Sequence, residues 1–286
     1  MLDNFHNIWY INKMKKLIVT LLVILIAVPA MSQEEAGDIF HQRGISYYQR
    51  GDLDKALEDF NRAIRLDPFN AYIFIDRGVI YLDKGDRNRA IEDFNRAITI
   101  DPNNAFAYHM RGNAYRDSGN LNRALEDLNK AISIDTKDPY LYTDRASIYL
   151  ERNDWARAID DYAKALALDS KLADAWLSRG DAYLQRGEYD RAISDYNKAL
   201  EFDPNSVQAL LGRAGAYREK QEWDRAITDY TRVINMDPTS AAAWSERGSA
   251  YLAKGDFDSA IRDFDKAIEL TPGAQTQQAP APANRR

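Results

Sequence analysis

The chain has 286 residues, contains no cysteine and carries a formal net charge of −6 at neutral pH. The absence of cysteine excludes disulfides, thiolate metal sites, cysteine nucleophiles and a lipid-modified cysteine. Lysine and arginine alternate with acidic residues rather than forming the basic surface that a phosphate backbone requires. We therefore expect no nucleic-acid partner.

The first 32 residues have the layout of an export signal. Two lysines at positions 15 and 16 precede an apolar run over residues 17–28, and small residues follow at Ala30 and Ser32. This order is typical of a secretory signal peptide, and the run is shorter than the roughly 20 residues that span a bilayer. We expect a true start at Met14, cleavage after Ser32 and export across a bacterial-type inner membrane to the periplasm or the medium.

An uncleaved segment is the alternative. The protein would then stay anchored in the membrane as an assembly factor that faces the extracytoplasmic side. Membrane contact is expected only in that case.

Beyond residue 36 one pattern recurs every 34 residues without insertion. The eleventh position is tyrosine in every copy, from Tyr47 to Tyr251, and the twentieth is alanine, from Ala56 to Ala260. A fixed period of this length marks a repeat protein whose copies stack on their neighbours. Residues 33–36 are expected to be a short linker and residues 275–286, rich in Gln, Ala and Pro, a disordered tail. The seven copies, called repeats 1 to 7 below, are 37–70, 71–104, 105–138, 139–172, 173–206, 207–240 and 241–274.

Each repeat has the pattern of two amphipathic helices joined by a turn. Apolar residues recur at intervals of three and four, as in Phe74 and Tyr81 and then in Ile91, Phe94 and Ile98. Glycine or alanine at position 8, facing alanine at position 20, predicts a close approach of the two helices. Glycine at position 15 suits a left-handed helix end, and aspartate or asparagine at position 16 suits the cap of the second helix.

Position 32 is proline in five repeats and ends the second helix. Thr136 and Ser170 replace it in repeats 3 and 4, and Ala146 and Asn153 replace two glycines in repeat 4. We expect the array to bend or open most easily near residues 135–172.

The pattern resembles the tetratricopeptide repeat, whose 34-residue signature is W-x2-L-G-x2-Y…A-x3-F…P. In repeat 1 the resemblance is carried by Gly44, Tyr47, Ala56, Phe60 and Pro68. It implies an all-α fold, a right-handed superhelical solenoid of seven helix-turn-helix repeats, with the first helices lining a concave groove. It also implies a non-catalytic scaffold that binds a protein or peptide in the groove or at the ends of the solenoid.

By the same resemblance, positions 2, 5, 6, 9, 12 and 13 line the groove. Aromatic and apolar residues concentrate there in repeats 1 to 4, and later repeats offer a more polar lining that includes Asp174. Aromatic and arginine side chains commonly anchor peptide ligands. A second interpretation, in which some rings only fill space between adjacent first helices, stays open. The candidate binding residues are His41, Tyr48, Tyr72, Ile75, Phe106, His109, Asn113, Arg116 and Tyr140.

Two charged positions are identical in all seven repeats. Such regularity indicates architecture, because a binding site seldom requires every repeat to be alike. We expect each position-7 arginine to pair with a position-23 aspartate in its own or the preceding repeat, since a guanidinium and a carboxylate form two parallel hydrogen bonds. This Arg–Asp ladder comprises Arg43, Arg77, Arg111, Arg145, Arg179, Arg213 and Arg247 with Asp59, Asp93, Asp127, Asp161, Asp195, Asp229 and Asp263.

The sequence predicts no catalytic residue, metal site or cofactor. Three histidines are present, and His41 and His109 lie two repeats apart, too far to share one metal ion. No glycine-rich phosphate loop appears. Besides the exported scaffold and the membrane-anchored assembly factor, a third possible function is an enzyme whose chemistry follows no recognised motif.

Repeat 7 keeps the apolar residues of the interior copies at Phe257, Ile261, Phe264 and Ile268, and no extra helix follows to cover them. Terminal repeats usually need a polar outer face. An exposed apolar patch marks an interface, so we expect self-association end to end or docking of a partner helix there.

Overall fold

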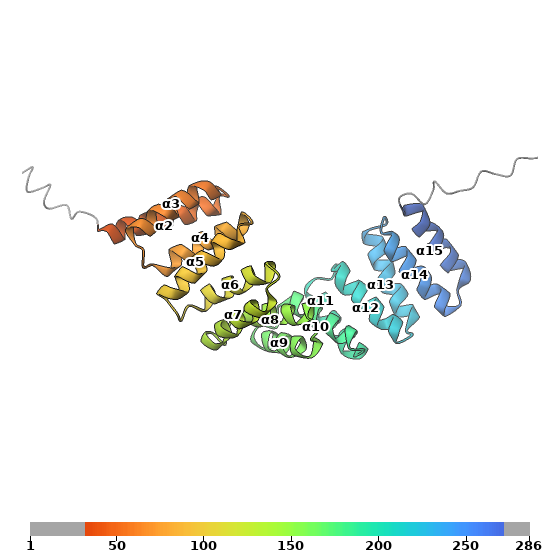
Figure 1. The fold of residues 1–286 in the computed structure, drawn as a ribbon. Coiled ribbons are helices and arrows are strands. Elements are labelled where there is room, and N and C mark those ends of the chain that lie inside the picture. Colours follow the sequence, from red (N-terminus) through yellow and green to blue (C-terminus); the bar gives the residue numbers. More distant parts are fainter. Residues whose placement is uncertain (1–31, 272–286) are drawn as a thin grey trace, which may run out of the picture. The chain divides into compact units, whose positions relative to one another are not determined.

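The computed structural model describes residues 32–271, in which every regular element is an α-helix. The expectations for the export signal, for Met14 and for the tail from residue 275 lie outside the described residues. Two compact bodies divide the described chain, one up to Pro102 with repeats 1 and 2 and one from Asn103 with repeats 3 to 7 (Figure 1). The helices are α2 (Gln33–Gln49), α3 (Leu53–Leu66), α4 (Ala71–Asp83), α5 (Arg87–Ile100), α6 (Ala105–Asp117), α7 (Leu121–Ile134), α8 (Pro139–Glu151), α9 (Trp155–Leu168), α10 (Ala173–Gln185), α11 (Tyr189–Phe202), α12 (Val207–Glu219), α13 (Trp223–Met236), α14 (Ala241–Lys254) and α15 (Phe257–Leu270).

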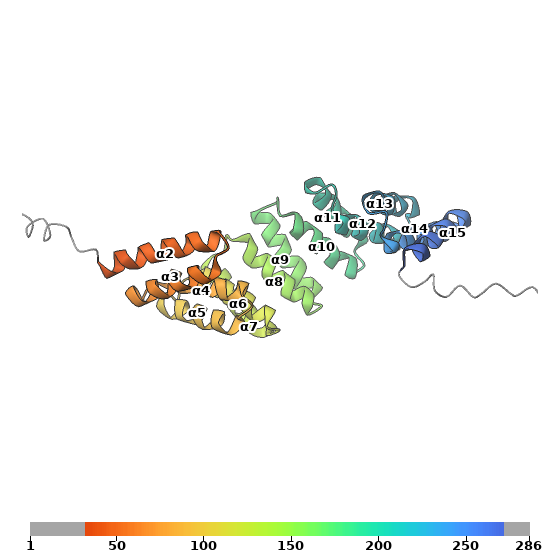
Figure 2. The ribbon, with the colours of Figure 1, turned by 90° about the horizontal axis from the view of Figure 1, so that it is seen from above.

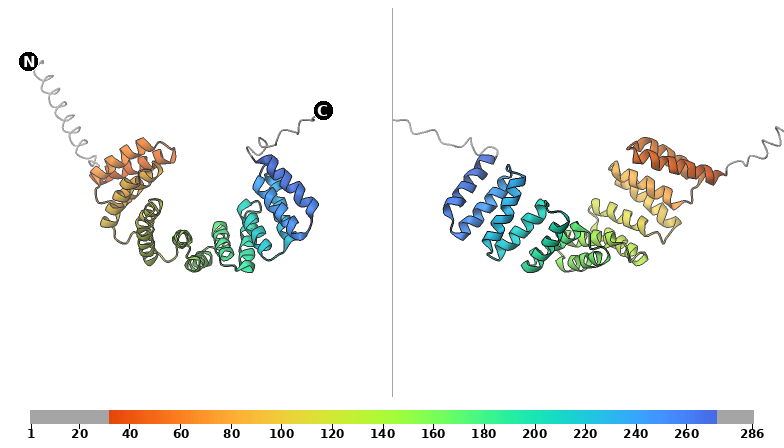
Figure 3. Two further views of the ribbon diagram at one scale, coloured as in Figure 1. Left: turned by 45° about the vertical axis from the view of Figure 1, so that its right-hand side comes forward. Right: turned by 180° about the vertical axis from the view of Figure 1, so that it is seen from behind.

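Within each body the helices stack in chain order. In the first body α2 packs on α3, α3 on α4 and α4 on α5 (Figure 2). In the second body the same succession runs from α6 to α15, so that each repeat contributes one helical hairpin and contacts its sequence neighbours (Figure 3). Each body is therefore a helical solenoid, as the 34-residue period predicts. Between residues 32 and 271 no helix is long and apolar enough to cross a membrane.

Helix ends follow the predicted turn chemistry, with one correction. Position 15 is left-handed in all seven repeats, including Asn153 and Gln221, whose φ angles are 57° and 61°. Residues 33–36, expected to be a linker, form the first turn of α2, because Ser32 and Glu35 make a reciprocal capping box. Cleavage after Ser32 would remove this cap from the helix.

In repeats 1, 2, 5 and 7 the glycine at position 8 lies against the aromatic ring at position 24 rather than against the alanine at position 20. A methyl group on Gly44 would lie 2.5 Å from the Phe60 ring, and one on Gly180 would lie 2.9 Å from the Tyr196 ring. In the repeats that combine glycine with a ring, the ring at position 24 thus lies directly against the backbone of the first helix. The expected pairing of two small residues is replaced by a ring-on-backbone contact. Repeats 4 and 6 instead place Ala146 and Ala214 beside a tyrosine, and repeat 3 has Leu128 at position 24.

The Arg–Asp ladder is present in every repeat. Each position-7 guanidinium donates through Nε and Nη2 to the two carboxylate oxygens of the position-23 aspartate of its own repeat, over 2.6–2.9 Å. All seven aspartates are buried. Because an unpaired carboxylate is costly to bury, the pair fixes how the two helices of a repeat meet.

The remaining guanidinium nitrogen, Nη1, connects neighbouring repeats. It donates to position 25 of the preceding repeat, where Arg77 contacts Asn61 over 2.5 Å and Arg247 contacts Thr231 over 3.0 Å. A second link joins position 14 to position 18 of the preceding repeat, as in the ion pair of Lys84 with the carboxylate of Asp54. The other links are Arg145–Asn129 and Arg213–Asn197 of the first kind and Arg152–Asn122, Lys220–Asp190 and Lys254–Asp224 of the second.

The junction of repeats 4 and 5 lacks both links. Positions 18 and 25 of repeat 4 are Ala156 and Ala163, which offer no side-chain acceptor. In addition, Leu172 precedes α10 without a side-chain cap. The junction therefore depends on apolar contact and on a hydrogen bond from the indole nitrogen of Trp176 to the carbonyl of Ser170 over 2.9 Å. It lies in the part of the chain where the sequence predicts weakness.

Two glycines of α12 provide a test of ring-on-backbone packing. A methyl group on Gly212 would lie 2.6 Å from the fully buried Tyr196 ring, whereas one on Gly215 would meet nothing within 4 Å. We expect Gly212→Ala to lower the free energy of unfolding by about 1–2 kcal/mol through overpacking. Gly215→Ala should raise it by roughly 0.5–1 kcal/mol through helix propensity. Urea denaturation of both variants measures the difference; equal effects would contradict the packing argument.

A double-mutant cycle tests the ladder. Asp161 is 2% exposed and Arg145 holds it with two hydrogen bonds. The single change Asp161→Leu leaves a largely buried guanidinium without its carboxylate partner and should lower the free energy of unfolding by about 3 kcal/mol, and Arg145→Met is the second single change. The double variant Arg145→Met/Asp161→Leu should lose clearly less than the sum of the single changes, with a coupling of about 1–3 kcal/mol. Additive losses would show that the pair does not act as a unit.

Hydrogen exchange tests the weak junction. Amide protons over residues 135–172 should be less protected than those of repeats 2 and 5, because fewer polar links resist local opening there. Introducing an acceptor with Ala163→Asn, which restores the residue found at position 25 in other repeats, should raise protection. Uniform protection in the native chain would remove the basis for a weak junction.

Candidate functional site

The most exposed candidate residues are the aromatic side chains at position 2 of the first helices. Tyr72 in the first body is 63% exposed, and Phe106 and Tyr140 in the second body are 49% and 57% exposed. Such large apolar side chains gain free energy when a ligand covers them. These three side chains are therefore accessible to a ligand, as the predicted binding surface requires.

The two histidines are not available, which corrects the sequence-based expectation. His41 and His109 are 7% and 9% exposed, and the Nε2 atom of each lies 2.5–2.6 Å from a carboxylate of the next repeat. The partners are Asp76 and Asp144 at position 6. Position 5 in these repeats thus faces the neighbouring first helix, and the histidine joins two repeats instead of facing a ligand.

Ile75 and Tyr48 also differ from a simple groove lining. Ile75, again at position 5, is fully buried, so it belongs to the core. Tyr48 is half-buried, and its hydroxyl donates to Asp83 of the next repeat over 2.8 Å. Ile75 is therefore not available to line a groove.

Asn113 and Arg116 surround the second histidine pair. The amide nitrogen of Asn113 donates to Asp144 over 3.1 Å, while its Oδ1 atom is buried without a partner among the described residues. Arg116 is half-buried. Burial acts to raise the pKa of Asp144, but the hydrogen bonds from His109 and Asn113 outweigh burial and lower it. Asp144 is therefore held as a carboxylate at the wall of the groove.

A hollow of about 430 Å³ opens between the first helices of repeats 4 and 5, beside Asp144. It combines one exposed ring, Tyr140, with hydroxyl groups and with charges of both signs. Such a mixture of an apolar wall and separate polar groups is typical of a ligand site. The hollow is lined by Tyr140, Thr143, Asp144, Ser147, Tyr162, Lys171, Leu172, Ala173, Asp174, Ala175 and Ser178.

Tyr162 forms the floor of this hollow. Its ring comes from the second helix of repeat 4 and is 2% exposed, and its hydroxyl lies 3.2 Å from the hydroxyl of Ser147. Burial raises the pKa of Tyr162, so the phenol stays protonated and serves as a neutral hydrogen-bonding group. Asp174 and Lys171 stand at the rim, exposed and without a described side-chain partner.

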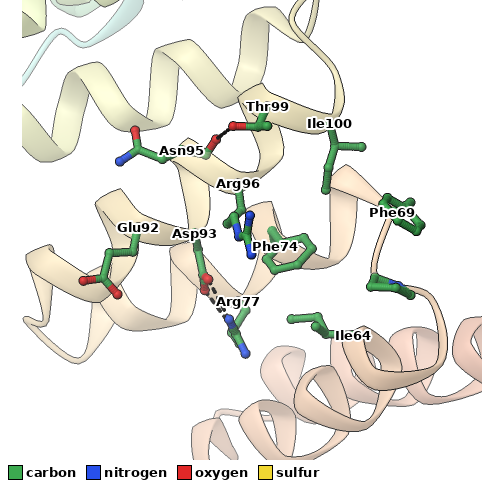
Figure 4. Close-up of a pocket in the computed structure, with 11 residues that line it drawn as sticks. Ile64, Phe69, Phe74, Arg77, Glu92, Asp93, Asn95, Arg96, Thr99 and Ile100 are labelled. Atoms are coloured by element: carbon green, nitrogen blue, oxygen red, sulfur yellow. Dashed lines mark hydrogen bonds and ion pairs between the residues drawn. The ribbon is translucent and has the colours of Figure 1, made fainter.

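A larger hollow of about 1090 Å³ lies in the first body, beside α5 and the turn after α3 (Figure 4). Ile64, Phe74 and Ile100 form apolar walls, and Phe69 stands at the edge with 80% exposure. The guanidinium of Arg77 is already paired with a buried aspartate here, so this part of the wall has no unsatisfied charge. We favour the smaller hollow as the binding site, because an exposed position-2 ring, Tyr140, lines it directly, whereas Tyr72 does not line the larger one.

Sequence reasoning missed the residues that complete the hollow. Tyr162 stands at position 24 of the repeat framework, where its hydroxyl distinguishes it from the phenylalanines of repeats 1, 2 and 7. The histidine pairs were also missed, but a signal existed: each histidine at position 5 is followed 35 residues later by an aspartate. In the described part of the chain no group of three or more potential metal ligands comes together.

Family models for the tetratricopeptide repeat match residues 41–105 and 143–207, 213–281 and 94–126, and a model described as TPR repeat matches residues 112–151. A search of curated proteins finds no match. Among solved structures, a tetratricopeptide repeat protein from Parabacteroides merdae is similar, with 22% identity, coverage of 85% of this chain and 96% of the other, and a TM-score of 0.61.

Two further structures share the fold. PilF of Pseudomonas aeruginosa has 21% identity, with coverage of 79% and 98% and a TM-score of 0.64. YrrB, titled a TPR protein with an unusual peptide-binding site, has 21% identity, with coverage of 64% and 95% and a TM-score of 0.58. The family matches extend over nearly all seven repeats and agree with the helical hairpins seen in the structure, and the chain therefore belongs to the tetratricopeptide repeat family.

Proposed function

We propose that the chain is a non-catalytic protein-interaction scaffold, and that the hollow of repeats 4 and 5 binds an extended segment of a polypeptide partner. The main observation that supports this proposal is that the exposed Tyr140 ring lies beside carboxylates and hydroxyls that line the same hollow. An extended peptide offers backbone groups for the hydroxyls and a side chain for the ring. YrrB, a structural relative with a peptide-binding site, supports this proposal by analogy of fold.

The charges of the hollow favour a segment with a basic side chain. Asp144 and Asp174 contribute two carboxylates and Lys171 one ammonium group. The Oδ2 atom of Asp144 is occupied by His109 and Asn113, which leaves its Oδ1 atom for a ligand. A lysine or arginine of the partner next to an apolar residue would meet complementary groups here.

The location proposed for this activity is outside the inner membrane. The lysine pair and the short apolar run over residues 17–28 support export by a cleaved signal peptide. The alternative is an uncleaved segment that holds the same scaffold at the membrane as an assembly factor. N-terminal sequencing of the protein from its source cell separates the two, since cleavage leaves a terminus near Gln33, and a terminus at Met31 would retain the Ser32 cap of α2.

A pair of matched variants tests the binding site. Tyr140→Ala/Asp174→Ala removes an exposed ring and an exposed carboxylate from the hollow, so capture of polypeptides on an array of random peptides should fall at least tenfold. The control Phe202→Ala/Asp160→Ala removes an exposed ring and an exposed carboxylate from second helices of the same body. The control should bind like the native chain, and both variants should keep the native circular dichroism.

The sequences of the peptides captured on the same peptide array also show whether basic side chains are preferred. Bound peptides should be enriched in lysine or arginine beside an apolar residue, and Asp174→Lys should reduce this enrichment. Equal losses in the hollow variant and its control would place the binding site elsewhere. Bound peptides without a basic residue would leave a binding function but reject the charge argument.

A further inference from the structure

The last helix, α15, exposes the apolar face that second helices inside the second body cover with the next repeat. Phe257, Ile261 and Ile268, at positions 17, 21 and 28, are 63%, 58% and 57% exposed. At positions 21 and 28 of repeat 4, Ile159 and Leu166 are 7% and 6% exposed. The difference arises because no repeat follows α15 in the described chain (Figure 3).

The surface that normally covers this face is positions 3 and 10 of a first helix. In repeat 7 these are Ala243 and Ala250, which are 1% and 0% exposed against α13 of repeat 6. In repeat 1 they are Ile39, which is 54% exposed, and Ser46, which is also exposed. The first helix of the array therefore presents an uncovered receiving surface, with an apolar residue at position 3.

If α2 is placed on α15 in the way that a first helix follows a second helix inside the array, side chains of opposite charge lie opposite each other. Arg43 at position 7 has an Nη1 atom without an acceptor, and its side chain is 47% exposed, compared with 14–19% for the other ladder arginines. Position 25 of repeat 7, which would supply the acceptor, is the exposed Asp265. Arg50 at position 14 and Asp258 at position 18 are likewise exposed and have no described side-chain partner.

We propose that α2 of a second copy of this chain covers α15, stacking as the next repeat would. Ile39 of one copy then packs on Ile261 and its apolar neighbours, while Arg43 meets Asp265 and Arg50 meets Asp258. These pairs repeat the links of internal junctions, such as Arg77 with Asn61 and Lys84 with Asp54, with full charges at both positions. The chain's own Gln/Ala/Pro tail is a poor occupant, because it offers no large apolar residue.

This contact joins two different surfaces, so it is heterologous. A heterologous contact leaves one free end on each side and builds open chains or closed rings rather than a simple dimer. Each added copy also adds one hollow of repeats 4 and 5. A partner with several binding segments would gain affinity from such an assembly, because its later binding steps become intramolecular.

Charge reversal tests the register. Sedimentation velocity of the full chain, with an identical N-terminus in every variant, should show concentration-dependent oligomers. Asp258→Lys and Arg50→Glu should each weaken association about tenfold by placing like charges together. The double variant should return to within about threefold of the native chain. Asp174→Lys, which also reverses an exposed aspartate in the first turn of a helix, should leave association unchanged.

Variants that block either α15 or α2 test whether the contact joins these two different surfaces. Ile261→Lys blocks α15 and Ile39→Lys blocks α2, so each variant alone should be monomeric. A mixture should form a heterodimer that grows no further, because one open α15 meets one open α2. Dimers of Ile39→Lys alone would show that α15 pairs with itself and would overturn the proposal. A monomeric native chain, or oligomers that none of these variants alters, would overturn it as well.

Discussion

A helical hairpin of this kind cannot bury both of its apolar faces, and this constraint organises the molecule. The second helix of each repeat offers apolar side chains at positions 21 and 28, and within each body the next repeat covers them. Stability is consequently built from neighbour contacts along each body rather than from one central core. The same constraint explains why the ends of the array differ from its interior and why α15 carries large exposed apolar residues.

Charged residues define the angle within each hairpin and the register between repeats, which apolar contact alone does not specify. Within a repeat, a buried aspartate and an arginine define the angle of the hairpin through two hydrogen bonds. The third nitrogen of the guanidinium then sets the register with the preceding repeat. Since apolar faces slide easily past one another, these directional contacts decide which side chains meet at each junction.

The proposed binding hollow lies at the junction that lacks both polar links. Ala156 and Ala163 replace the acceptors there, so repeats 4 and 5 are joined by apolar packing and by the hydrogen bond from Trp176 to the Ser170 carbonyl, without either of the regular side-chain links. A junction of this kind can adjust its opening with little loss of polar contacts. The junction at the hollow can change its opening while the other junctions stay regular, because each junction depends only on the two repeats that form it.

The sequence by itself determined the repeat boundaries, the two helices per repeat, the left-handed turn at position 15 and the Arg–Asp pairing, since these follow from local propensity and from identity across seven copies. Tertiary structure decided what position 5 does: His41, Ile75 and His109 occupy proposed groove positions but are buried, and the two histidines contact an aspartate of the next first helix. It also decided that in repeats 1, 2, 5 and 7 the glycine at position 8 contacts a ring at position 24, not an alanine at position 20. These outcomes depend on the distances and angles between helices, which a residue pattern does not encode, because the same spacing places a side chain in a groove or in a junction according to how closely the neighbouring helix packs.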